Sequence, residues 1–417
     1  MSQPLHLIVR NVACMEEKLM KVDNSYNMAC HDWIIAGRQE KSLLDEARIA
    51  LILQDILHLD ISPQLMEYLL CSIAYIPAID ASLITKFTQW LNSLDPLRRD
   101  TLFESVLAHQ SQQIRAGVSR LIEVIGDPNI AENLIAHLNR EHDPHAKRAM
   151  LHCLHRLGKR LPDDVAHDLF RHDSDWVVQS YALSHLPKCT SCLLIADGTD
   201  FAADLGKMAQ DAGFKFVTVS APTTFDTITT LQHLDAEILK AYDLLILVKG
   251  EHYTRATEHD YYSQIHQFVS EGGNLFATSW VCWENASNGV LTDLLPFVHL
   301  HNTYHENVII TCCPTDHTFA LQLFPEQITY VSSYELLQGK DDTAILFETD
   351  QHIPIFGFRH FGKGMCYYFN TCQHYCFGEM PSPFKTNAQL ELSFQRVFQW
   401  IFDTLQHDAE ANKSNLN

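Results

Sequence analysis

The sequence predicts an all-α domain of stacked helix pairs over residues 1–188, followed by a doubly wound α/β domain with a flavodoxin-like parallel sheet over residues 190–407. Three observations predict this fold class. The first half repeats every 32 residues, the second half alternates between strand and helix patterns, and the 417 residues of the chain are too many for one ordinary core. Residues 408–417 are expected to form a disordered tail.

The repeat in the first half has a helical period. Three segments begin at Gln112, Pro144 and Trp176, and each places apolar residues four positions apart, on one face of a helix. The equivalent positions are Ile114, Ala146 and Val178, then Val118, Met150 and Ala182, then Ile122, Leu154 and Leu186. Companion helices lie between the segments. A helix pair of this kind cannot bury its inner face alone, so we expect neighbouring pairs to stack.

Asp-Pro pairs at Asp95, Asp127 and Asp143 mark expected helix starts, because Pro suits the first turn and Asp accepts its free amides. The pattern Asp-Pro-x-Ala-Lys-Arg from Asp143 resembles the HEAT-type repeat. Arg115 and Lys147 match the basic position of that repeat, whereas Gln179 departs from it. The resemblance implies an α-solenoid from about residue 40 to residue 188, and the upstream segments either continue the stack or cap it.

The expected use of an α-solenoid is an extended surface for another macromolecule. We therefore expect the repeats to bind a protein partner, with Arg115, Lys147 and Arg148 as contacts, because a charged groove steers an oppositely charged surface. Two plainer alternatives are open. The domain could only support its neighbour, and the three cations could be solvated charges worth about 0 to 1 kcal/mol each.

Composition excludes some classes of function. The chain carries 30 basic and 51 acidic side chains, a formal charge of −21, which disfavours direct binding to nucleic acid. No apolar run reaches membrane-spanning length, and the first apolar run is too short for a signal peptide. We therefore expect a cytoplasmic protein, not bound to a membrane, whose 12 cysteines are reduced. A homo-oligomer is an open alternative.

The second half alternates strands and helices. The expected strands are SCLLIADG, FKFVTV, YDLLILVKG and NLFATSW, and the expected helices are DFAADLGKMAQDAG and EHDYYSQIHQFVSEGG. Short connections between them imply right-handed crossovers and a parallel sheet covered on both faces. A ligand would lie beyond the carboxyl ends of the strands, at Asp197 and Gly198, at 249–252 and at 279–283. The stretch ADGTD lacks the Gly-x-Gly-x-x-Gly spacing, so no nucleotide or other cofactor is expected.

The order of the later segments resembles the class I glutamine-amidotransferase-like superfamily, and most closely its trehalose-utilisation (ThuA-like) branch. The resemblance covers about residues 190 to 405. It is carried by Gly-Gly at 272–273, by Gly-Lys-Gly at 362–364, and by Asp316-His317 and Tyr334-Glu335 between them.

Amidotransferases of this superfamily place a cysteine on a sharp strand-to-helix turn, because the thiol must be exposed to attack an amide. Here Ser279, Trp280 and Val281 follow the strand, Cys282 comes a few positions late, and no Gly-x-Cys-x-Gly is present. The ThuA-like branch implies a polar pocket instead. Its residues carry over to Asp316, His317, Glu335 and His374, and Ser279 stands about where the branch has a histidine. The candidate catalytic residues are thus His374, Asp316, His317, Glu335 and Cys282.

Metal binding is not expected, although two cysteine patterns keep the question open. Cys372, His374 and Cys376 alternate, so on a strand they would share a face, whereas structural zinc prefers Cys-x-x-Cys pairs from turns. Cys189 and Cys192 have that spacing but lie at the junction of the two domains. The histidines His142, His145, His152 and His155 fall at helical spacings, and a solvated helix face is the preferred interpretation.

These observations favour a non-catalytic assembly or regulatory subunit of a multiprotein complex of bacterial type. The repeats would bind a protein partner, and the amidotransferase-like domain would be degenerate, a pseudoenzyme. The alternative is an enzyme that acts on a small sugar-like or amide substrate, with a histidine and a carboxylate as general base and acid.

Overall fold

The structure is a computed structural model, and it describes residues 25–56, 61–77, 80–126, 130–196, 198–220, 231, 233–248, 261–278, 280–286, 289–315, 319–371 and 381–414. The chain divides into two compact units, Met1–His185 and Leu186–Asn417, called here the helical unit and the α/β unit. The first holds helices and the second a mixed sheet with helices, which confirms the expected order of classes. None of the described helices is both long and apolar enough to cross a membrane.

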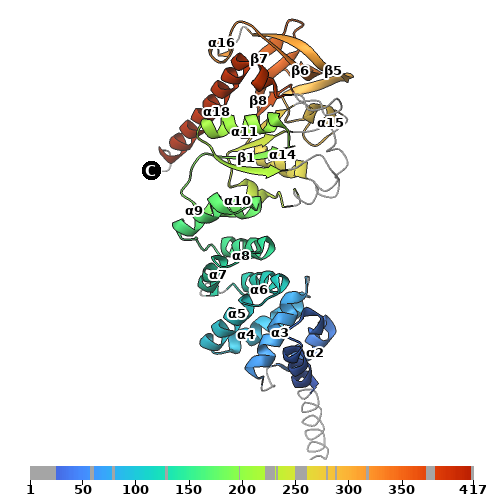
Figure 1. The fold of residues 1–417 in the computed structure, drawn as a ribbon, viewed down its shortest axis with the longest axis vertical. Coiled ribbons are helices and arrows are strands. Elements are labelled where there is room, and N and C mark those ends of the chain that lie inside the picture. The colour runs from blue at the N-terminus through green and yellow to red at the C-terminus, as the bar shows by residue number, and fades with distance from the viewer. Residues whose placement is uncertain are drawn as a thin grey trace, which may run out of the picture. The chain divides into compact units, whose positions relative to one another are not determined.

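The helical unit is a succession of short helices (Figure 1). Residues 25–35 are helical, and the 3₁₀ turn η1 (Glu40–Ser42) follows. The later helices are α2 (Glu46–Asp55), α3 (Pro63–Tyr75), α4 (Ala81–Ser93), α5 (Pro96–Leu107), α6 (Gln112–Ile125), α7 (Ile130–Leu138), α8 (Pro144–Arg156), α9 (Asp163–His172) and α10 (Trp176–His185). Helix α6 packs between α3 and α8, and α8 also packs against α10. Successive helix pairs are therefore neighbours in space as well as in sequence.

Helix starts and core positions agree with the sequence pattern. Asp95 and Asp143 each accept hydrogen bonds from amides in the first turn of the helix that follows, and a Pro occupies that turn. The third predicted start, Asp127, lies outside the described residues. All nine equivalent apolar positions of the repeat are buried: Ile114, Val118, Ile122, Ala146, Met150, Leu154, Val178, Ala182 and Leu186. Buried apolar side chains therefore recur with the same 32-residue period as the sequence pattern.

The α/β unit is built on one nine-stranded sheet with strand order β2-β1-β3-β4-β9-β8-β7-β5-β6. Its strands are β1 (Ser191–Ala196), β2 (Lys215–Ser220), β3 (Leu244–Leu247), β4 (Asn274–Thr278), β5 (Phe297–Pro314), β6 (Ile328–Gly339), β7 (Ala344–Thr349), β8 (Pro354–Phe361) and β9 (Gly364–Phe369). Strands β2, β1, β3, β4 and β9 pair in parallel, as expected. The other half pairs antiparallel, so the prediction of a parallel sheet is wrong for β5 to β8.

The helices of this unit are α11 (Asp200–Asp211), α13 (Ala236–Leu239), α14 (Tyr261–Glu271), α15 (Val281–Asn285), α16 (Ala320–Leu323), α17 (Pro383–Thr386) and α18 (Ala388–Ser414). In the parallel half of the sheet, α11 packs against β1 and β2, and α14 packs against β4 and β9. In the antiparallel half, α15 packs against β5 and α17 against β6. Helix α18 packs against α11 (Figure 1) and inserts Phe394 and Phe398 beside the sheet, where Phe398 stacks 5.1 Å from Phe276. It continues to Ser414, so residues 408–414 of the expected tail are helical.

The two glycine motifs of the sequence meet at the start of β4 and β9. A Cβ atom on Gly364 would lie 1.9 Å from the carbonyl oxygen of Gly273, and one on Gly362 would lie 2.6 Å from that of Ser270. Gly362 also has a positive φ of 57° in the two-residue connection between β8 and β9. Glycine is required here because two backbone segments approach more closely than any side chain permits.

Candidate functional site

The strand-to-helix turn after β4 is present, and a tryptophan occupies it. Trp280 has φ 76° and ψ −20°, is buried, and stands immediately before helix α15. A left-handed conformation is rare for a bulky residue and costs on the order of 1–3 kcal/mol unless its surroundings hold it. The turn therefore has the shape expected of a nucleophile position, but its side chain has no nucleophilic atom.

Glu335 on β6 holds this turn in place. Its carboxylate is fully buried and accepts the backbone N–H of Trp280, the hydroxyl of Tyr368 at 3.0 Å, and a ring nitrogen of His299 at 3.0 Å. Three donors satisfy a charge that would otherwise be costly to bury. The carboxylate that the sequence singled out thus joins β4, β5 and β9 around the turn.

Asn370, directly after β9, fixes the backbone on which Glu335 stands. Its Oδ1 accepts the Glu335 N–H at 2.9 Å, and its Nδ2 donates to the carbonyls of Glu335 at 2.8 Å and of Pro354 at 2.9 Å. The side chain is fully buried. Asn370 therefore links β6 to β8 and β9, although β6 pairs with neither in the sheet.

Cys282 lies two residues past the turn, in a setting that disfavours attack on a substrate. Its thiol is buried and donates to the Phe297 carbonyl at 3.6 Å, while its N–H donates to the Tyr368 hydroxyl at 3.1 Å. Burial, reinforced by the charge of Glu335, raises the pKa of this thiol well above its usual value. Since the thiolate is the reactive form of cysteine, the protonated thiol of Cys282 is a packing group here.

His299 on β5 is a polar residue of this cluster that the sequence analysis did not select. Its side chain is 1% exposed. Because a carboxylate only accepts hydrogen bonds, the Nδ1 atom next to Glu335 carries a proton. Among the described residues Nε2 has no partner, and the Trp283 ring lies 4.8 Å away. The only signal in the sequence was the clustering of His299, His301 and His305 in a segment for which no strand or helix was predicted.

The remaining sequence candidates of this region lie outside the described residues. They are Asp316, His317 and His374, together with Asp197, Ser279, Cys372 and Cys376. Their predicted roles stay predictions. Within the described chain, Cys192 is buried inside β1 and Cys189 is half-buried, and both are free thiols. No group of three or more metal-ligating side chains gathers among the described residues.

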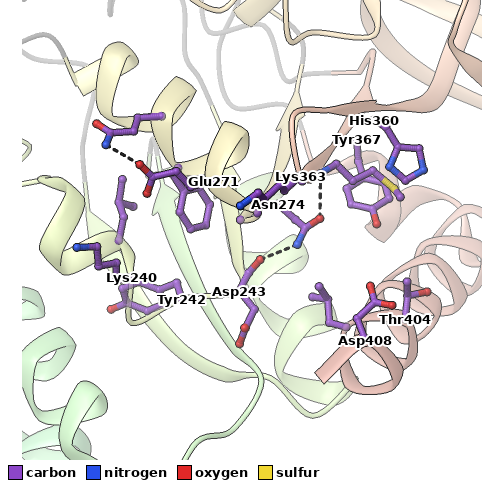
Figure 2. A pocket seen from close by; sticks show the side chains of 18 of the residues that line it. Lys240, Tyr242, Asp243, Glu271, Asn274, His360, Lys363, Tyr367, Thr404 and Asp408 are labelled. Carbon is purple, nitrogen blue, oxygen red and sulfur yellow. Dashed lines mark hydrogen bonds between the residues drawn. The ribbon is translucent and has the colours of Figure 1, made fainter. Parts of the chain in front are cut away.

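A hollow of about 630 Å³ opens at the opposite edge of the sheet, beside the amino ends of β3, β4 and β9 (Figure 2). Asn274 lies in its middle and donates to the Asp243 carbonyl at 3.0 Å. Burial raises the pKa of the Asp243 carboxyl, which accepts the Ser191 N–H at 2.9 Å. The charged lining residues are Lys188, Lys240 and Lys363 against Asp243, Glu271 and Asp408. This balance of signs favours neither an anion nor a cation.

In the helical unit, Arg115 is engaged within the protein. It forms two hydrogen bonds to Glu141, at 2.6 and 2.8 Å, and donates to the carbonyls of His109 and Gln110 at 2.7 and 3.0 Å. Side-chain exposure is 15% for Arg115 and 5% for Glu141. Burial alone would raise the pKa of Glu141, but the hydrogen bonds from Arg115 and from two backbone amides hold it below its usual value. The pair ties α6 to the segment before α8.

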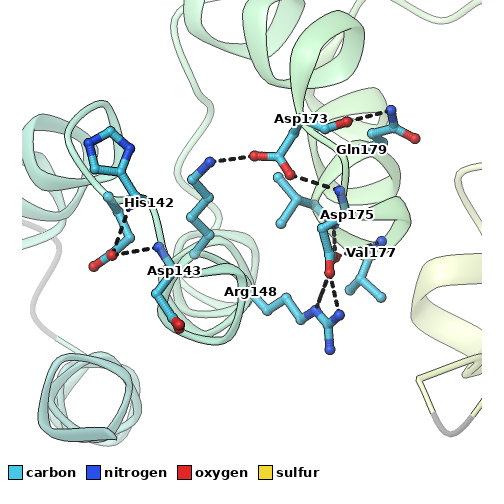
Figure 3. Close-up of polar contacts among 10 residues, drawn as sticks. His142, Asp143, Arg148, Asp173, Asp175, Val177 and Gln179 are labelled. Atoms are coloured by element: carbon cyan, nitrogen blue, oxygen red, sulfur yellow. Dashed lines mark hydrogen bonds and ion pairs between the residues drawn. The ribbon is translucent and has the colours of Figure 1, made fainter. Parts of the chain in front are cut away.

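The other two predicted contact residues repeat this arrangement one unit later. Lys147 pairs with Asp173, and Arg148 pairs with Asp175, with its Nε 3.0 Å from Oδ1 (Figure 3). Both acids also accept backbone N–H groups at the start of α10. Lys147 and Arg148 therefore lie in ion pairs between successive helix pairs. Their role in partner binding stays a prediction.

No protein-family model and no curated protein matches the chain. Among solved structures, it is similar to a cytoplasmic protein from Salmonella typhimurium LT2, with 16% identity, a TM-score of 0.40, and coverage of 52% of this chain and 99% of that one. A putative ThuA-like protein from Parabacteroides merdae has 13% identity and a TM-score of 0.36, and the match covers 52% of this chain and 90% of that one. A glutamine amidotransferase from Thermotoga maritima has 10% identity and a TM-score of 0.31, and the match covers 53% of this chain and 96% of that one. At such low TM-scores these likenesses carry no argument about activity or ligand.

Proposed function

We propose that the chain is a non-catalytic assembly or regulatory subunit. In this proposal, the helical unit is a HEAT-like solenoid that binds a protein partner, and the α/β unit is a degenerate amidotransferase-like domain. The observation that carries the proposal is the turn after β4. Trp280 occupies the position where a nucleophile would stand, and the buried Glu335 carboxylate is committed to holding that turn.

The state of Cys282 supports the same proposal. A cysteine nucleophile needs exposure and a lowered pKa, and this thiol has neither. The test is ammonia release from glutamine by the purified full chain, for which we expect no release above background. Release that Cys282→Ala abolishes would contradict the pseudoenzyme proposal, and Cys153→Ala, at another buried thiol, is the matched control.

Partner binding by the helical unit is tested by cross-linking the endogenous complex with an amine-reactive reagent. We expect partner cross-links at exposed or half-buried lysines of the helical unit, Lys41, Lys86 and Lys159. Partner cross-links confined to lysines of the α/β unit, such as Lys207 and Lys385, would place the interface elsewhere and contradict this part of the proposal.

A second function, an enzyme that acts on a small substrate, is favoured by one observation. His299 and Glu335 form a buried pair in which the carboxylate orients the imidazole, and the Nε2 atom has no partner among the described residues. Such a pair has the geometry of a general base and its orienting group. Activity toward a small sugar or amide that His299→Gln removes, with an unchanged melting temperature, would favour this alternative.

A further inference from the structure

A second polar site lies in the helical unit, around the loop that follows helix 25–35. Two hollows of about 450 and 550 Å³ share three lining residues, Arg38, His109 and Gln110. Gln110 donates to the carbonyl of Gly37 at 3.0 Å and so ties the loop to the end of α5. We call these three side chains, with Trp33 beneath them, the Arg38 site.

His109 contributes a buried ring N–H that makes no hydrogen bond of good geometry among the described residues. Burial lowers the pKa of this imidazole, and a contact with the Arg38 backbone opposes that shift. The ring is 6% exposed, and its Nδ1 accepts the backbone N–H of Ser111 at 3.0 Å. The proton of the neutral ring must therefore lie on Nε2. This Nε2–H is buried, although the imidazole lines both hollows.

Trp33 adds a second donor of the same kind. Its ring is fully buried and stacks on His109, with centroids 6.3 Å apart and planes 3° from parallel. Its indole Nε1–H likewise has no partner in the described part of the chain. Native proteins leave few buried donors unpaired, and each instance calls for an ion, a water or a ligand that accepts the hydrogen bond.

Arg38 completes the site with unused donors on a strained backbone. Its guanidinium lies 5.8 Å from the Trp33 centroid and, among the described residues, makes one hydrogen bond, to Glu67 at 3.1 Å. A guanidinium has five N–H groups arranged as a fork, so within the described part of the chain most of them are available to a planar anion. The residue has φ 59°, which is uncommon for a residue other than glycine.

Acceptors at this site are fewer than donors. The Glu67 carboxylate is engaged by Arg38, and the Glu40 carboxylate is engaged by the Ser111 hydroxyl. Lys41 lines the smaller hollow and adds a positive charge. The charges of Arg38 and Lys41 are balanced by those of Glu40 and Glu67, so the excess at this site is one of hydrogen-bond donors, and a ligand that only accepts hydrogen bonds fits it best.

We propose that the Arg38 site binds a carboxylate of the partner protein, either a side-chain carboxylate or a chain terminus. The guanidinium of Arg38 provides the fork for the two oxygens, and the Nε2–H of His109 provides a further donor. The partner is that of the proposed function, on which this inference rests. The carboxylate chemistry itself is testable without the partner.

The experiment uses the full chain with isotope-labelled tryptophan and follows the indole N–H resonance of Trp33, assigned with Trp33→Phe. Three probes are titrated at constant ionic strength. N-acetylglycylglycine carries only a terminal carboxylate, N-acetylglutamate α-amide carries only a side-chain carboxylate, and N-acetylglycinamide carries none. We expect a saturable shift of the Trp33 resonance with one or both acids and none with the amide.

Arg38→Asn removes the guanidinium, while asparagine tolerates a positive φ, so the loop is expected to keep its conformation. This variant should bind the acid at least about tenfold more weakly, the loss expected for a charge-assisted hydrogen bond. Arg38→Lys keeps the charge without the fork and should also weaken binding. Arg98→Asn, at an exposed arginine of α5, should bind normally.

Three results would overturn the proposal. The first is no shift with either acid. The second is a shift in both Arg38 variants equal to that of the unchanged protein. The third is a shift with the neutral amide equal to that with the acids, which indicates that the site does not distinguish a carboxylate. Cross-links of the endogenous partner outside the helical unit, together with a normal titration, would contradict the proposed function and leave the carboxylate site standing.

Discussion

Arg115→Ala is the most direct test of the ion pairs that connect successive helix pairs within the helical unit. The substitution removes both hydrogen bonds to Glu141 and leaves that carboxylate nearly buried. It also leaves the carbonyls of His109 and Gln110 without the guanidinium. The folded state loses these interactions, while the unfolded chain loses little.

The magnitude follows from the burial of the pair. Breaking a fully buried ion pair costs about 3–5 kcal/mol, whereas an exposed pair is worth about 0–1 kcal/mol. Glu141 keeps the N–H groups of His142 and Asp143, both at 2.9 Å, so the loss falls below the buried limit. We expect the free energy of unfolding to fall by about 2–3 kcal/mol, or roughly 5–10 °C in melting temperature for a unit of this size.

Calorimetry of the full chain measures this loss in the transition of the helical unit. Arg120→Ala is the matched control, because Arg120 is exposed on the same helix. The double substitution Arg115→Met with Glu141→Gln should recover part of the stability, since no buried charge is left unpaired. If Arg115→Ala unfolds at the same temperature as Arg120→Ala, the argument from burial is refuted.

Three further predictions concern packing, the turn and pH. Gly117→Ala should lower the free energy of unfolding by about 3 kcal/mol or more in urea titrations, because its Cβ would lie 1.8 Å from the carbonyl oxygen of Ala74. Glu335→Gln should cost about 2–4 kcal/mol in the same assay, because an amide cannot accept all three hydrogen bonds and turns a donor toward other donors. Burial lowers the pKa of His185 to about 4 from 6.5, so its contribution to stability should be complete above pH 6.5 and should decline by about 3 kcal/mol as the pH falls to 4. Urea titrations at both pH values measure this decline.

Each of the three has a control. Gln113→Ala changes an exposed residue on the helix of Gly117 and should be nearly neutral. Glu335→Gln should unfold the α/β unit earlier without moving the transition of the helical unit, and the opposite order would contradict the assignment of its contacts. His185→Gln should reduce the loss of unfolding free energy between pH 6.5 and pH 4. An unchanged loss would mean that other groups cause the acid sensitivity.

The core of the helical unit could be predicted from the sequence, because burial there repeats with the sequence. The ion pairs were visible in the same repeat but were not recognised. Arg115 and Lys147 each have an acid 26 residues later, at Glu141 and Asp173. A cation alone on a helix face indicates a solvent-facing contact, whereas a cation and an acid that both recur with the repeat indicate a bridge between units.

The antiparallel half of the sheet was missed for a local reason. Strands β8 and β9 are joined by only two residues, Gly362 and Lys363, and a connection this short cannot cross over a sheet. The stretch Phe-Gly-Lys-Gly was therefore a hairpin signal. The contacts of Glu335 with His299 and with Asn370 span 36 and 35 residues and depend on strand pairing, which no local pattern specifies.

The buried carboxylate of Glu335 also limits how this domain can evolve. A single substitution at position 280 could place a thiol on the turn, yet the nearby Glu335 carboxylate is needed there for its hydrogen bonds to the turn, to Tyr368 and to His299. A thiolate at position 280 would lie close to the negative charge of Glu335. A like charge nearby raises the pKa of the thiol and so suppresses attack on a substrate. Placing a reactive cysteine on this turn would thus require rebuilding the support of the turn as well, and the forms with only one of the two changes would be less stable.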